Sequence, residues 1–170
     1  MTAKIMGAIL IISTCGGFGF SLAAAHKREE KALNALLRAC QMMICELEYK
    51  QPPLPELCRL AAEEAGGIVG QVFQHLSAAL ETQISGDVGT CMKQVLTKQN
   101  NLPSRTAGNL LLFGQSMGRF ALSGQLTELK SMVEMCKRDI QSLSVNRDAR
   151  LRSYATLGIC CGVALVVLFI

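Results

Sequence analysis

The stretch that decides the fold runs from Lys27 to Tyr49 and reads KREEKALNALLRACQMMICELEY. Most of its large apolar side chains recur every three or four positions, at Leu33, Leu36, Leu37, Cys40, Met43, Ile44 and Leu47. A repeat of this period lines one face of an α-helix, while Glu29, Arg38 and Glu48 fall off that face. The stretch therefore predicts an amphipathic helix whose apolar face must be covered by other elements.

The segments that follow have the same helical period. The Pro-rich stretch after Tyr49 ends the first helix, because Pro52 disfavours helix at Gln51, and Pro55 suits the first turn of a second helix. Gly66 and Gly67 then separate the second helix from a third. Two short helices are predicted at about 88–96 and 106–117, and a long sixth helix covers about 126–143. No segment alternates with the period of a strand, so we predict an all-α bundle of about six helices.

Two uncharged runs flank this bundle, Ile5 to Ala25 and Tyr154 to Ile170. The first is long enough to cross a bilayer. The second would measure roughly 25 Å as a helix, against about 30 Å for the hydrocarbon core. We therefore predict transmembrane helices at residues 5–25 and 154–170, a short tail at residues 1–4 and a helical domain at residues 26–153.

Basic residues sit beside both runs, on the domain side, at Lys27, Arg28, Arg147, Arg150 and Arg152. Positive charge next to a membrane helix favours the cytoplasmic side. We expect a two-pass protein of the cell membrane with its central domain in the cytoplasm. The alternative is a signal peptide cleaved after Ala25, which would leave a helical interaction protein anchored only by its C-terminal run.

Small residues four positions apart occur in both predicted spans. Gly158 and Gly162 form a G-x-x-x-G pattern, and Gly19 and Ala23 form a similar pair. Such pairs let a second helix approach closely, so we expect these four positions to pack against a neighbouring helix. The alternative is a chance pattern in segments rich in glycine and alanine.

No pattern of catalytic or metal-binding residues can be assembled. The two histidines, His26 and His75, have no partner at metal-ligand spacing, and no nucleophile–base or phosphate-loop motif is present. The five cysteines between the runs are odd in number and fall in or beside apolar helical patterns, which suits free thiols in a reducing compartment. The net charge of +4 lies largely at the edges of the runs and Trp is absent, which disfavours nucleic-acid binding. We predict no enzymatic activity, no cofactor and no metal.

Four groups of residues resemble a known family. They are Leu36-Leu37 through Tyr49 with Pro53 to Leu57, Phe113 to Arg119 followed by Gly124 to Leu126, Arg150 to Gly158 with Gly162, and the first run with Lys4 and Gly7. In this combination the chain resembles the stage III sporulation protein AB family of endospore-forming bacteria. It departs from that family at Phe120-Ala121, where an acidic residue is common, and its last domain helix is less acidic.

The resemblance implies a function, because this family is similar to the F-type inner-membrane platform proteins of type II secretion and type IV pilus systems. It implies a non-enzymatic platform subunit of the channel complex between mother cell and forespore, on the mother-cell side of the forespore membrane. The implied partners are the secretion-type ATPase of the stage III sporulation set, other membrane subunits of the complex and membrane lipid. A homo-oligomer is compatible with this role.

The resemblance also points to residues in two turns, one at Pro53–Glu56 and one at Gly114–Arg119. The candidate positions are Tyr49, Pro53, Pro55, Glu56, Gly114, Gly118, Arg119 and Gln125. They would either form a contact surface for a partner or only set bends in the bundle, since Gly and Pro act first on backbone geometry.

Overall fold

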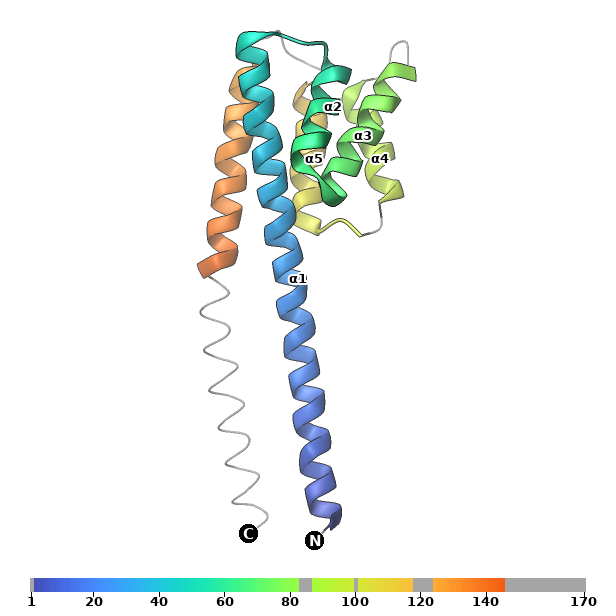
Figure 1. Ribbon diagram of the computed structural model, residues 1–170, viewed down its shortest axis with the longest axis vertical. Helices are drawn as coiled ribbons and strands as arrows, with labels where there is room; N and C mark the ends of the chain where they lie inside the picture. Colours follow the sequence, from blue (N-terminus) through green and yellow to red (C-terminus); the bar gives the residue numbers. More distant parts are fainter. Residues whose placement is uncertain (1, 83–86, 100, 118–123, 146–170) are drawn as a thin grey trace. The chain divides into compact units, whose positions relative to one another are not determined.

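A computed structural model describes residues 2–82, 87–99, 101–117 and 124–145, with side chains from Ala25 onward. These residues form α1 (Thr2–Tyr49), α2 (Leu54–Ala65), α3 (Gly67–Thr82), α4 (Val88–Lys98), α5 (Ser104–Met117) and a further helix over residues 124–145 (Figure 1). Since the described ranges contain no strand, the predicted all-α class is confirmed.

The chain divides into two compact units, one of residues 1–27 and 141–170 and the other Arg28–Ile140. In the first unit, the described residues 2–27 and 141–145 are helical. No helix among the described residues meets the length and hydropathy required of a membrane span. The predicted second span, with Gly158 and Gly162, and the flanking Arg147, Arg150 and Arg152 lie outside the described residues.

Helix α1 is one uninterrupted helix of 48 residues, so the elements predicted before and after His26 are continuous. The sequence suggested separate elements because charged side chains begin at Lys27. No Gly or Pro occurs between Gly19 and Pro52, so nothing in the backbone interrupts the helical hydrogen bonds. The hydropathy of the side chains changes along α1 while its backbone conformation does not.

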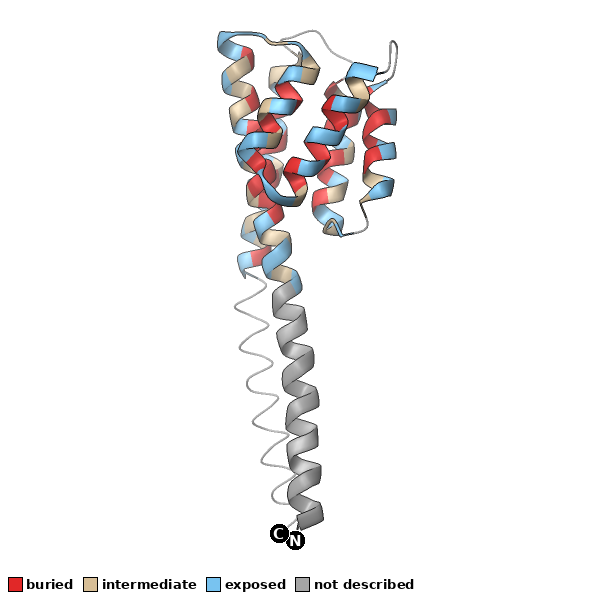
Figure 2. Ribbon diagram, turned by 45° about the vertical axis from the view of Figure 1, so that its right-hand side comes forward, coloured by how far each residue is buried: buried red, intermediate tan, exposed pale blue. Residues whose placement is uncertain are grey.

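Within the unit Arg28–Ile140, α1 buries the predicted apolar face (Figure 2). Its buried residues are Ala32, Leu33, Ala35, Leu36, Ala39, Cys40, Met43 and Leu47. The three alanines widen the buried strip beyond the predicted stripe, whereas Leu37 and Ile44 are only partly buried. A strip of this width can contact more than one neighbouring helix.

Helices α2 and α3 form a tightly packed pair around the predicted glycine break. Gly66 and Gly67 have φ values of 61° and 55°, which favour glycine, and the Gly66 N–H donates to the Ala62 carbonyl oxygen at 3.1 Å. A Cβ atom at Gly70 would lie 2.6 Å from the same Ala62 oxygen. Because Gly70 has no side chain, the two helix backbones can approach this closely.

The centre of the unit contains an aromatic pair that joins α3 to α5. Phe73 and Phe113 are both fully buried, and their ring centroids lie 5.4 Å apart with the planes at 89°. This edge-to-face arrangement is one of the favoured geometries for aromatic rings. The pair therefore holds α3 and α5 against each other, although the two helices are distant in sequence.

The helix over residues 124–145 completes the core. It buries Leu129, Met132, Val133 and Cys136, while the predicted seam positions Leu126 and Ile140 are partly buried. All six helical segments contribute to one cluster of buried side chains. A single shared core of this kind is what allows a domain to fold by itself.

Candidate interaction site

Most of the cysteine thiols in the described part of the chain are buried. The described residues contain no cluster of three His, Cys, Asp or Glu side chains able to bind a metal ion. Burial raises the pKa of Cys58 to about 12, and burial together with the Asp139 carboxylate raises the pKa of Cys136 to about 11. These buried thiols stay neutral and unreactive at neutral pH. Cys45 is exposed, whereas the other four described cysteines are buried.

The turn that follows α1 presents an exposed aromatic side chain. Tyr49 is 83% exposed. The backbone N–H groups of Lys50 and Gln51 both donate to the Glu46 carbonyl oxygen, at 2.8 and 3.0 Å. Gln51 has a φ of 50°, a conformation that costs a residue with a side chain about 1–2 kcal/mol. The chain thus leaves α1 through a strained residue placed two positions after Tyr49.

The start of α2 is fixed by backbone carbonyl groups. The Pro53 carbonyl accepts a hydrogen bond from the Leu57 N–H at 3.0 Å, and Pro55 lies in the first turn, where its missing N–H costs no helical bond. The Pro55 carbonyl accepts a hydrogen bond from Ser77 Oγ of α3 at 2.8 Å. Ser77 is buried, and the sequence analysis missed it because a serine on a helix shows no sign of a partner in another helix. Glu56 points into solvent.

Gly114 lies within α5 and is buried, so the prediction of a turn beginning there is wrong. A Cβ atom at this position would lie 2.5 Å from Met92 Cβ on α4. Gly89 faces the same contact, since a Cβ there would lie 3.5 Å from the Gly114 carbonyl oxygen. The two glycines let α4 and α5 pack closely. This fits a role for Gly114 in shaping the bundle. Gly118 and Arg119 lie outside the described residues.

Gln125 connects two helix ends. Its side-chain Nε2 donates to the Met117 carbonyl oxygen at 3.3 Å. This contact satisfies one of the carbonyl groups left unpaired at the end of α5. Gln125 therefore fixes the start of the helix over residues 124–145 against α5.

The structure brings several candidate residues to one end of the Arg28–Ile140 unit. The helices alternate in direction, so α1 and α5 end where α2 and the helix over residues 124–145 begin (Figure 1). We call the end formed by Tyr49, Pro53, Glu56 and Gln125 the turn surface. Gly114 is not part of this surface, because it is buried between helices.

A groove lies between α5 and the helix over residues 124–145. Its volume is about 250 Å³, and it is lined by Leu112, Gln115, Ser116, Glu128, Ser131, Met132 and Met135. Leu112 is 46% exposed, which is unusual for a large apolar side chain in this unit. The sequence analysis did not single out these residues, because the groove forms only when the two helices pack together.

The remaining predicted residues lie along α1. Gly19 and Ala23 are both within this helix. Lys27 and Arg28 are exposed where α1 passes from one compact unit to the other. Their exposure is consistent with a role as solvated charges.

The fold and the candidate site together define the class of this protein. It is a helical bundle whose candidate functional residues lie mainly in turns at one end of the domain. A family profile described as Stage III sporulation protein AB matches residues 4–170, so the chain belongs to the stage III sporulation protein AB family. A solved structure titled Stage III sporulation protein AB has a TM-score of 0.62 and 19% identity, covering 72% of this chain and 98% of that one. At that identity the likeness shows the fold. No curated protein was found to match the chain.

Proposed function

We propose that the chain is a non-enzymatic membrane platform subunit of the sporulation channel complex between mother cell and forespore. The observation that carries this proposal is the family match, which takes in the helical domain and both uncharged runs. Helix α1 adds support, because it carries the first uncharged run and the stripe of core residues in one continuous helix. The role is positional, and the chain itself performs no chemistry.

In this role the helical domain docks the secretion-type ATPase of the stage III sporulation set. The turn surface supports docking because Tyr49 holds a large aromatic ring in solvent, and tyrosine is enriched in protein interfaces. The two uncharged runs cross the cell membrane and contact other membrane subunits through Gly19, Ala23, Gly158 and Gly162. The apolar groove beside α5 is a second surface available to a partner or another copy of the chain.

The domain is proposed to lie in the cytoplasm, on the mother-cell side of the forespore membrane. Exposed Lys27 and Arg28 beside the first run favour this orientation, and the free thiols suit a reducing compartment. The basic residues that follow Ala25 at once favour an uncleaved first run. The mass of the mature chain tests this point, since a signal peptide would leave a new N-terminus at His26.

The docking proposal can be tested with a fragment of residues 26–145, which contains the whole Arg28–Ile140 core. We expect the fragment to bind the nucleotide-bound ATPase oligomer saturably. Tyr49→Ala should weaken binding about tenfold or more if the ring is a central contact, whereas Tyr49→Phe should retain most of the affinity. No detectable binding by the unmodified fragment would reject docking through this domain.

A further inference from the structure

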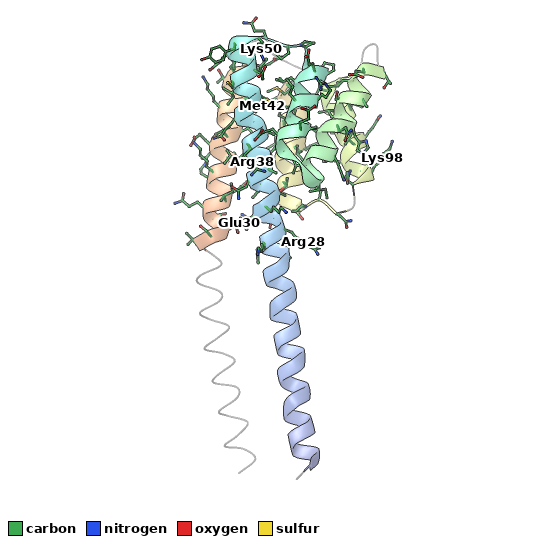
Figure 3. All side chains as sticks on the ribbon, viewed as in Figure 1. Arg28, Glu30, Arg38, Met42, Lys50 and Lys98 are labelled. Carbon is green, nitrogen blue, oxygen red and sulfur yellow. The ribbon has the colours of Figure 1, made fainter. Side chains whose placement is uncertain are left out.

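One end of the Arg28–Ile140 unit collects exposed basic side chains from three helices. Arg28 and Lys31 lie on α1 where it enters the unit, Lys98 ends α4, and Arg105 lies in the first turn of α5. Figure 3 shows Arg28 at this end, Lys98 about level with Arg38, and Lys50 at the other end. We call this set of four residues the basic end.

A contact between α1 and α5 brings Arg105 close to Arg28. The Arg105 backbone N–H donates to Glu29 Oε1 at 3.4 Å, and the Arg105 Nε atom lies 4.0 Å from the same oxygen. The first turn of α5 is therefore tied to the residue that follows Arg28 on α1. Lys98 is the last residue of α4, and α5 begins six residues later at Ser104.

Three carboxylates, Glu29, Glu30 and Asp139, lie near the four cations, and Asp139 accepts a hydrogen bond from Asn109, one turn after Arg105. Glu29 is engaged by Arg105, and both Glu29 and Glu30 are partly buried. Arg28 and Lys31 are three residues apart, so they lie on the same side of α1. The basic end thus presents a cationic surface to solvent, with residues contributed by distant parts of the chain.

On the basis of the proposed membrane anchorage, we propose that the basic end binds the headgroups of anionic phospholipids. Arg28 and Lys31 follow Ala25, the last residue of the uncharged run, by three and six positions. Along a helix these separations correspond to about 5 and 9 Å, within the Debye length of about 8–10 Å over which an anionic bilayer attracts basic side chains. Lys98 and Arg105 extend the surface across the domain, so headgroup binding would also orient the domain. Arg28 and Lys31 closely follow the uncharged run in the sequence, which favours lipid over other polyanions.

The test uses the fragment of residues 26–145 and vesicles of equimolar phosphatidylglycerol and phosphatidylcholine at low ionic strength. A Lys31→Gln/Lys98→Gln variant removes two charges from the basic end. A matched Lys50→Gln/Lys93→Gln variant removes two exposed lysine charges elsewhere. Because a lysine near an anionic surface contributes about 1 kcal/mol, we expect the first variant to lower the partition coefficient about thirtyfold. The matched variant should lower it no more than about threefold, and neither should change the urea midpoint appreciably.

An equal loss of binding in both variants would overturn the proposal, because it would show a general effect of net charge. It would also be overturned if the fragment sedimented equally with pure phosphatidylcholine vesicles, or preferred DNA or an acidic polypeptide to anionic vesicles. Fractionation of the full chain separates this result from the proposed function. If the full chain is found in the membrane fraction but the fragment does not bind anionic vesicles, only headgroup binding by the basic end is rejected. If the full chain is absent from the membrane fraction, the platform role is rejected.

Discussion

Replacement of Gly114 by Ala tests the close packing of α4 against α5. The new Cβ would lie 2.5 Å from Met92 Cβ and 2.9 Å from Met92 Cγ. Met92 Cβ is attached directly to the backbone and cannot swing aside, so the two helices must move apart. Overpacking of this kind costs about 1–3 kcal/mol, and the higher helix propensity of Ala returns about 1 kcal/mol. We expect the free energy of unfolding to fall by about 0–2 kcal/mol.

Gly108 provides a matched control on the same helix. It is exposed, and a Cβ atom there would have no neighbour within 4 Å. Gly108→Ala should therefore gain only helix propensity, about 1 kcal/mol. Urea unfolding of the fragment of residues 26–145, followed by circular dichroism, should show a difference of about 1–3 kcal/mol between the two variants. If Gly114→Ala proved as stable as Gly108→Ala, the close contact described here would be wrong.

Three further predictions concern the packed core and the turn that follows α1. Phe113→Ala should lower the free energy of unfolding by about 3–5 kcal/mol because it leaves a cavity beside Phe73, and a loss below about 1 kcal/mol in urea unfolding would contradict its central position. Gln51→Gly should raise that free energy by about 0.5–1 kcal/mol because it relieves the φ of 50°, whereas Gln51→Ala should give no such gain. Stability should fall as the pH rises above 9, because Cys58 ionises with its ordinary pKa of 9.0 in the unfolded chain but keeps its proton to about pH 12 when folded. Urea midpoints measured across this range should depend less on pH in Cys58→Ala, and an unchanged dependence would count against burial of the thiol.

The sequence predicted much of the fold because its local signals agree with the tertiary packing. The apolar positions of α1 recur with the helical period, so the face containing Leu36 and Met43 could be assigned to the core. Pro52 and the Gly66-Gly67 pair break helices through their backbone geometry, which depends little on the rest of the chain. Helix ends at these positions were therefore predictable.

Other features depend on partners that are distant in sequence. Asn109 is buried because its Nδ2 donates to Asp139 Oδ2 at 2.9 Å, and no local pattern marks that pair. Gly114 was assigned to a turn through the family resemblance, whereas the structure uses it as a contact between helices. The ion pair of Glu29 with Arg105 joins residues 76 positions apart, so the basic end could not be recognised before the fold was known.

The platform role is tested most directly by purifying the full chain from detergent-solubilised membranes of cells that also produce the ATPase. We expect the chain to be found in the membrane fraction and the ATPase to co-purify with it, with less ATPase recovered when Tyr49→Ala replaces the native residue. A chain recovered only in the soluble fraction, or one that leaves the membrane fraction without the ATPase, would contradict the account.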